Sequence, residues 1–540
     1  MKRILLFLAA ISMVMLPSCE KPEPDSGEQE QAPAGYKELL QAYDAGKLFV
    51  AVQTEADASV VAFEDGSTVS VPFSSFMVHD HTSGAAPKVE VETGMSWWSV
   101  GGSLTGIKVL ASDVAHEDAE PVYVYYDAKT LHMYLSNREV LDFNSKVLED
   151  EADLTRRQDI PVIYIDTGGK GIYDKDNYVD GTITIKDPGK LYSDVTEFSA
   201  AMGIRGRGNS TWGFPKKPWK VKLKEKASIF GMGADKEWCL LANYADRTLM
   251  RNILAMRISE VCGFSWTPHM YSVHVYLNNE YQGVYTFCEH KKVSSSRVDI
   301  DLDAGDVYLE IEQQQDETTC WWTGMGVPMM FSDPEVPSAD LLAEIKKHFK
   351  DFEASLYSSY LADPDKGYAA YIDVDSFIDY YIVQELAKNT DGNLRKSSFI
   401  TKKKGGKLEM YHLWDFDLTF GNGGGLLHDP KGFFIKDYNP SWTLGDNWFN
   451  RMLRDPAFAD RLQARWNELY PQLQSMVDFI DEQALILDKA QQKNFQKWSI
   501  WDSVDWVDCP SLGSYQAEVN FLKDFYTKRL EWLNTELNKL

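Results

Sequence analysis

The chain has 540 residues, of which 44% are hydrophobic and 13% aromatic, so it is rich enough in apolar side chains to form buried cores. This composition excludes a wholly disordered protein, and the length predicts several domains. The formal net charge is −26, whereas binding to nucleic acids needs clustered positive charge. We therefore expect no nucleic acid partner, and a phosphorylated ligand would require basic residues gathered at one place.

The N-terminus has the pattern of a bacterial lipoprotein signal. A basic start precedes an apolar run over residues 4–16, and the sequence LPSC places Cys19 close behind it. The run is too short to span a membrane comfortably, so we interpret residues 1–18 as a signal peptide. Cys19 would then be lipidated, followed by a flexible tether over residues 19–35. This predicts a lipid-anchored protein of the bacterial cell envelope, at the outer membrane or cell surface; the alternative is an ordinary secretory signal with a chance cysteine.

The pattern of residues 36–150 predicts a small antiparallel β domain. Short β-prone runs such as KVEVETG and VYVYYD alternate with turn residues, after a short helix expected over residues 36–45. No set of acid, base and nucleophile stands out in this part of the chain. We therefore expect a spacer or a binding module, and the acidic segment over residues 148–159 marks its boundary.

Positive charge gathers in the β-rich segment that follows. Residues 204–226 read IRGRGNSTWGFPKKPWKVKLKEK, which joins a Gly-rich and Ser/Thr-rich loop to a strand expected over residues 219–223. On that strand Lys220 and Lys222 point away from the apolar side chains. A loop rich in backbone N–H groups beside such a strand can bind phosphates; the alternative is a solvated lysine face on an edge strand.

Helices and one hairpin are predicted from caps, turns and apolar spacing. One helix is expected to start at Asp246 as its N-cap and to stop at Gly263, and a later helix is expected to be capped by Ser338. A hairpin is predicted to turn at 278–279, where two asparagines follow each other. A further helix over residues 374–388 leads into the most informative stretch of the chain.

That stretch, NTDGNLRKSSFITKKKGGKLEMYHLWDFDLTFGN, predicts carboxylates on both sides of a short hairpin. Strands are expected over residues 397–401 and 408–413. The residue before the first strand and the residue after the second lie at the same open end, so Asp391 is expected near Asp415 and Asp417. Hard oxygen ligands gathered in this way suit Mg²⁺, and phosphoryl transfer often uses such an arrangement. The alternative is that the first acid caps a turn and the other two are solvated at a strand end.

The order of several motifs resembles a known family. The motifs IRGRGNSTWGFPKKPWKVKL, ADRTLMRN, YQGVYTFCEH, NTDGN and WDFDLTFGN follow one another within about residues 160–480, and they look like the spore coat protein H (CotH) family of atypical secretory-pathway kinases. The resemblance implies an α+β, kinase-like two-lobe domain over residues 155–540, with a β-rich lobe at about 155–315 and a helical lobe at about 335–540. It also implies ATP with Mg²⁺ or Mn²⁺ as cofactors, and Ser or Thr of an exported protein as the phosphate acceptor.

The resemblance also implies roles for individual residues. Asp391 would be the catalytic acid that orients the acceptor hydroxyl, Asp415 would hold the metal, and Asp417 would be an additional ligand or support one. Glu289 would pair with a lysine or coordinate metal at the nucleotide. The basic side chains implied at the nucleotide phosphates are Lys217, Lys220, Lys222 and Arg205.

One position departs from the family pattern. Members often carry an Asn about five residues after the catalytic Asp, and here Lys396 stands at that position, with Asn393 nearer. A kinase loop uses such an Asn as a metal ligand, so the substitution bears on metal loading. Two other functions therefore stay open: a catalytically silent kinase-like scaffold or glycan-binding lipoprotein, and a metal-dependent phosphate-ester hydrolase that uses water with the same carboxylates.

We expect Cys19→Ser to release the protein from membranes, because the lipid on Cys19 would be its anchor. Fractionation of cells that express the variant, followed by immunoblotting, measures the effect. Cys509→Ser, far from the N-terminus, is the control and should stay in the membrane fraction. Unchanged membrane association of Cys19→Ser would contradict the lipoprotein interpretation.

Overall fold

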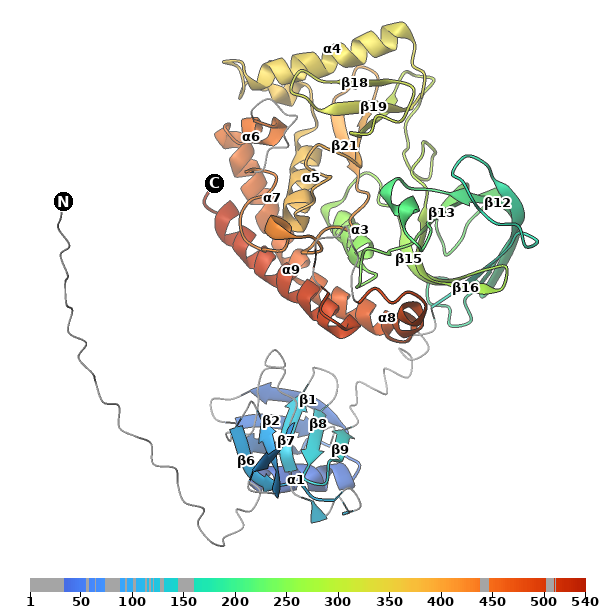
Figure 1. The fold of residues 1–540 in the computed structure, drawn as a ribbon. Coiled ribbons are helices and arrows are strands. Elements are labelled where there is room, and N and C mark those ends of the chain that lie inside the picture. Colours follow the sequence, from blue (N-terminus) through green and yellow to red (C-terminus); the bar gives the residue numbers. More distant parts are fainter. Residues whose placement is uncertain are drawn as a thin grey trace, which may run out of the picture. The chain divides into compact units, whose positions relative to one another are not determined.

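The computed structural model contains helices and strands throughout, which confirms the predicted α+β class. It divides into two units, residues 1–153 and 154–540, which are drawn in Figure 1. The predicted signal peptide, Cys19 and most of the tether lie outside the described residues. The structure describes residues 34–143, with gaps at 55–57, 64, 73–87, 93–94, 101–102, 112–113, 116–117, 120 and 127–130, and residues 160–540 apart from 438–445, 502–508 and 510.

The first unit contains three small antiparallel sheets and a helix, as its alternating sequence predicts. Helix α1 (Ala34–Asp44) buries Tyr36, Leu39 and Ala42 at a spacing of three residues, against the sheet residues of the same core. The sheets are β1 (Phe49–Thr54), β2 (Ala58–Phe63) and β3 (Thr68–Pro72); β4 (Lys88–Glu92), β5 (Met95–Val100) and β6 (Ser103–Lys108); and β7 (Pro121–Tyr126), β8 (Leu131–Leu135) and β9 (Val140–Phe143).

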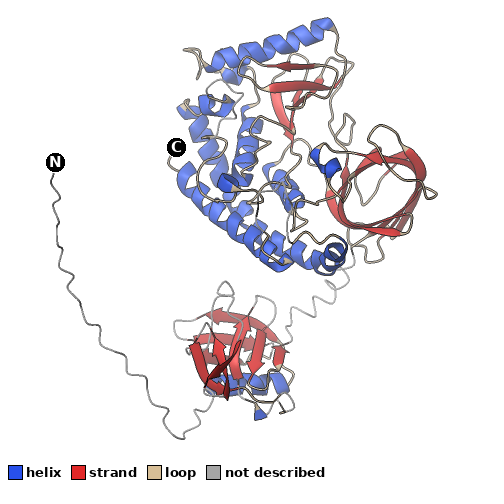
Figure 2. Ribbon diagram, in the orientation of Figure 1, coloured by secondary structure: helices blue, strands red, loops and turns tan. Residues whose placement is uncertain are grey.

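Seven strands of the second unit close into a barrel, seen end-on in Figure 2. The order is β10-β11-β12-β13-β14-β16-β15, and a parallel pairing between β10 and β15 closes it. On β13, Trp219, Val221 and Leu223 are buried while Lys220 and Lys222 lie on the other face, as predicted. The strands are β10 (Val162–Asp166), β11 (Val179–Lys186), β12 (Glu197–Gly206), β13 (Trp219–Ala227), β14 (Asp235–Leu241), β15 (Met270–Leu277) and β16 (Glu280–Glu289).

The turn between β15 and β16 confirms the predicted hairpin. Asn278 and Asn279 have φ values of 49° and 68°. Both central residues are left-handed, which matches the twist of the flanking strands and suits asparagine.

A second sheet and a group of helices complete this unit. The sheet has the order β18-β19-β17-β20-β21, and its β20–β21 hairpin confirms the one predicted from sequence. The sheet strands are β17 (Val307–Ile311), β18 (Cys320–Trp322), β19 (Pro328–Asp333), β20 (Ser398–Lys402) and β21 (Leu408–His412). The helices are α3 (Arg251–Cys262), α4 (Ala339–Leu356), α5 (Val374–Ala387), α6 (Trp448–Met452), α7 (Pro456–Gln474), α8 (Met476–Lys497) and α9 (Tyr515–Leu537). Within the described part of the chain, no helix combines the length and apolar character that a membrane crossing needs.

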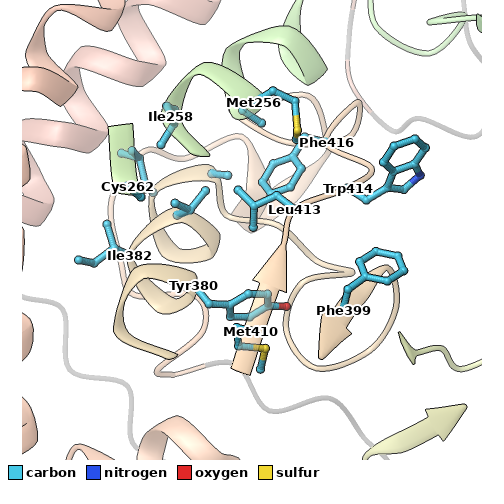
Figure 3. Close-up of a cluster of buried hydrophobic side chains, with 14 of the residues drawn as sticks. Met256, Ile258, Cys262, Tyr380, Ile382, Phe399, Met410, Leu413, Trp414 and Phe416 are labelled. Carbon is cyan, nitrogen blue, oxygen red and sulfur yellow. The ribbon is translucent and has the colours of Figure 1, made fainter. Parts of the chain in front are cut away.

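The core of the second sheet joins α3, α5 and the segment after β21, as Figure 3 shows. Tyr380 of α5, Phe399 of β20 and Phe416 after β21 are all fully buried. Large apolar side chains of α5 and β20, together with those of the more distant α3, therefore fix where the segment after β21 runs.

Capping follows the prediction in α4 but not in α3. Ser338 accepts a hydrogen bond from the Leu341 N–H, as expected for an N-cap. The helix expected after Asp246 begins only at Arg251, so the predicted cap is wrong. The physical reason is Leu249, whose φ of 61° breaks the right-handed helical path. The predicted end of α3 at Gly263 is confirmed, because Gly263 has a left-handed φ of 73°.

Two arginine–carboxylate pairs that involve α5 should contribute very differently to the free energy of unfolding. Arg529 of α9 contacts Glu385 at 2.7 Å with side chains only 0% and 1% exposed, whereas Arg461 of α7 contacts Asp375 with side chains 51% and 66% exposed. Arg529→Met should lower the free energy of unfolding by about 3–5 kcal/mol, because it leaves a carboxylate buried without its partner. Arg461→Met should cost less than about 1 kcal/mol. Urea denaturation measures both, and equal losses would contradict the prediction.

Candidate active site

A cleft of about 860 Å³ runs between the barrel and the second sheet. Barrel residues Arg205 and Lys220 line it, and so do Glu310 and Met330 of the second sheet. The loop at Gly208 and the short 3-10 helix Ser210–Gly213 contribute to the same wall. The predicted phosphate-binding loop therefore faces a cavity large enough for a small-molecule ligand.

The structure brings the three predicted acids into this cleft. Asp391 follows α5, whereas Asp415 and Asp417 follow β21, and all three line the cavity. Burial and the charge of Asp415 raise the pKa of Asp391. Burial, together with Asp415, Asp246 and Asp391, raises the pKa of Asp417 well above its ordinary value. The acids thus form one interacting group at the open end of the hairpin.

The backbone around these acids is held in an uncommon conformation. Asp415 has φ at 67°, and Leu394 and Ser397 have φ at 53° and 48°. Such left-handed residues are costly unless the surroundings impose them, and they often occur at functional sites. The hydroxyl of Ser397 also lies 3.4 Å from Oδ2 of Asp415, to which it donates a hydrogen bond. This hydrogen bond therefore links the end of the loop that starts at Asp391 to the segment that carries Asp415.

The ADRTLMRN motif holds the segment that carries Asp415 and Asp417. Nη1 of Arg251 contacts Oδ1 of Asp246 at 2.5 Å, with both side chains 1% exposed, and its Nε donates to the Thr419 carbonyl at 3.0 Å. Oδ1 of Asn252 accepts from the Phe416 N–H at 2.7 Å. This motif positions the acidic segment by buried polar contacts.

Lys220 is the lysine of the basic segment that reaches the cleft. Its Nζ lies 2.8 Å from Nε2 of His290 and 3.2 Å from Oε2 of Glu237. Burial lowers the pKa of Lys220, against the opposing effect of Glu237. The side chain is held in place on the barrel wall with its ammonium group directed at polar partners.

Three other predicted ligands do not line the cleft. Nζ of Lys217 donates to the Trp212 carbonyl at 2.7 Å. Lys222 is 49% exposed and lies 3.3 Å from Oε1 of Glu237. Glu289 is buried and accepts from the backbone N–H of His269 at 3.0 Å. Their implied contacts with a nucleotide remain predictions.

The cleft also contains residues that the sequence analysis did not single out. Arg207 lies over the Trp414 ring at 5.7 Å, and both line the cavity. Glu310 pairs with Lys291, and burial raises the pKa of Glu312 to about 7. The only sequence signal for Arg207 was its place in the basic segment, whereas the two glutamates read as ordinary alternation within a strand.

The chemistry of the acids fits a divalent cation. Among the residues that the structure describes, no group of three or more His, Cys, Asp or Glu side chains has the arrangement of a ready metal site. However, burial and the charge of neighbouring carboxylates raise the pKa of Asp391 and of Asp417, so a bound cation would offset charge that is unfavourable there. Carboxylate oxygens are the ligands that Mg²⁺ and Mn²⁺ prefer. Asp415 and Asp417 are therefore the residues that would hold such an ion.

Comparison with known proteins places the chain in a family. Residues 204–533 match the family described as CotH kinase protein. No curated protein matches the chain. The matched region contains the barrel from the end of β12 onward, most of the residues that line the cleft and all three acids, and it spans more than half of the chain. The chain belongs to the CotH kinase family.

Proposed function

We propose that the protein is an envelope-anchored atypical protein kinase that transfers the γ-phosphoryl group of ATP to Ser or Thr of exported proteins. The observation that carries the proposal is the cleft, which has basic side chains on its barrel wall and three interacting carboxylates at its other side. The barrel would act as the β-rich lobe and the second sheet with its helices as the other lobe. Membership of the CotH kinase family suggests an atypical kinase and the use of ATP.

The barrel wall offers positive charge to phosphates. Nε of Arg205 is buried and has no hydrogen-bond partner among the described residues, and its guanidinium lies over the Tyr178 ring at 5.1 Å. Lys220 adds an ammonium group on the neighbouring strand. In a chain with a net charge of −26, this local concentration of positive charge supports binding of a triphosphate.

Asp391 is the residue suited to accept the hydroxyl proton. In the proposed step the Ser or Thr oxygen forms a bond to the γ-phosphorus while the bond to the β,γ-bridging oxygen breaks, and ADP leaves with that electron pair. The hydroxyl proton goes to Asp391. Its raised pKa makes it a better proton acceptor than an ordinary aspartate. Bound at Asp415 and Asp417, Mg²⁺ or Mn²⁺ would neutralise phosphate charge.

The sequence of the N-terminus supports the envelope location. A lipidated Cys19 would keep the kinase at the outer membrane or cell surface, where its acceptors would be exported proteins. A catalytically silent scaffold or glycan-binding lipoprotein shares this location, and a phosphate-ester hydrolase shares the carboxylates. Transfer of labelled phosphate from ATP to protein, rather than to water, separates the three functions.

We expect Lys220→Met to weaken ATP binding about ten-fold or more, because a charge-assisted hydrogen bond is worth about 1.5–3 kcal/mol. Lys222→Met, on the same strand and also paired with Glu237, should change the affinity less than about three-fold. Isothermal titration with Mg²⁺ and ATP measures both. Equal losses would show that the basic strand acts only through its overall charge.

We expect Asp391→Asn and Asp415→Asn to fail in different ways. Asp391→Asn removes the proton acceptor, so it should lower phosphotransfer by about 10²-fold or more with Mg-ATP binding nearly unchanged. Asp415→Asn should instead weaken metal-dependent nucleotide binding. Radiolabelled ATP transfer and titration calorimetry measure the two effects. Full activity of Asp391→Asn, or absence of nucleotide binding by the unaltered protein, would contradict the kinase proposal.

A further inference from the structure

Lys396 lies at the end of the loop that starts with Asp391. Its backbone N–H donates to the Asp391 carbonyl at 2.8 Å, so the loop returns on itself. Lys396 lines the cleft together with Asp391, Asp415 and Asp417. The left-handed residues Leu394 and Ser397 flank it. The backbone conformation of the loop therefore places this lysine beside the acids.

The ammonium group of Lys396 has no polar partner in the part of the chain that the structure describes. Within the described residues its side chain forms no hydrogen bond and no ion pair, although its charge lowers the pKa of both Asp391 and Glu312. Lys291, by contrast, is paired with Glu310 in the same cleft. A half-buried cation that is close to carboxylates yet paired with none of them is available to a ligand.

The chemistry of lysine also bears on how many metal ions the site can hold. An ammonium group has three donors and no acceptor, so it cannot ligate a metal ion. Its charge also repels a nearby cation. Asp391, Asp415 and Asp417 carry three negative charges when ionised, which one divalent cation and Lys396 together balance. At the position of Lys396, a second metal ion would find a repelling ammonium group and no ligand atom.

We propose that Lys396 contacts the transferred phosphoryl group and supplies the positive charge that a second metal ion would otherwise supply. The inference rests on the proposed kinase function and adds a catalytic residue to it. As the acceptor oxygen bonds to the γ-phosphorus and ADP departs with the electron pair of the broken bond, charge spreads over the non-bridging oxygens of the phosphoryl group. The N–H donors of Lys396 stabilise these oxygens, while Asp391 takes the proton.

Counting bound Mn²⁺ tests the inference without any turnover. The unaltered protein is titrated with Mn²⁺ in the presence of adenylyl imidodiphosphate, an ATP analogue that resists transfer, and electron paramagnetic resonance measures the free ion. We expect one Mn²⁺ per bound nucleotide. Lys396→Asn replaces the cation with an amide oxygen that can ligate a metal ion, so this variant should bind a second Mn²⁺. Two tightly bound ions in the unaltered protein would overturn the inference.

Kinetics of Lys396 variants provide the second test. Lys396→Met should lower kcat by roughly ten- to hundred-fold, with the nucleotide dissociation constant changed less than about three-fold, because the contact strengthens only as charge develops. Lys396→Arg keeps the charge and should recover part of the rate. Lys407→Met removes an exposed lysine from the β20–β21 turn and should leave kcat unchanged.

The outcomes separate this inference from the proposed function. If the unaltered protein binds no nucleotide, the kinase proposal fails and the inference fails with it. If it binds nucleotide and transfers phosphate while Lys396→Met retains full kcat, only the role of Lys396 is wrong. Thermal denaturation of each variant identifies a misfolded protein, and in that case the Mn²⁺ count of the unaltered protein decides.

Discussion

The site depends on one electrostatic constraint, which is the confinement of three carboxylates in a partly closed cleft. Burial and mutual repulsion raise the pKa of Asp391 and of Asp417. Such groups repel one another unless the backbone holds them, and the left-handed conformations of Asp415 and Ser397 show that it does. The surrounding structure therefore keeps unfavourable charges together, an arrangement that would favour the cation of the proposed function.

A buried polar scaffold supplies that restraint. The Asp246–Arg251 pair and Asn252 fix the segment after β21 from the side of α3, by contacts with the backbone at Thr419 and Phe416. Buried pairs of this kind add little net stability, because the desolvation of the two charges offsets their attraction, and the contribution of these contacts here is to define one arrangement. In this protein the arrangement that they define is the orientation of the acidic segment toward the cleft.

Opposite charges on opposite sides of the cleft suit a ligand with a phosphate chain. The chain is strongly acidic overall, yet Arg205, Arg207 and Lys220 meet on the barrel wall. Lys220 is oriented by His290 and Glu237, whereas Arg205 has a buried donor without a partner among the described residues. Lys220 is therefore held in a fixed orientation by the protein, whereas that N–H of Arg205 is available to a ligand.

Local patterns in the sequence were sufficient for several of the elements and for part of the site. The alternation along residues 219–223, the asparagine turn and the β20–β21 hairpin follow from neighbours in the chain, and the hairpin brings Asp391 near Asp415. Closure of the barrel depends on the pairing of Val162 in β10 with His274 in β15, which no local pattern encodes. Likewise, Lys217 and Lys220 read alike in sequence, but Lys217 bonds back to the nearby Trp212, whereas Lys220 lines the cleft and meets His290 from a distant strand end. Side-chain direction follows from the period of a strand, whereas the partner that each side chain meets depends on contacts between distant segments.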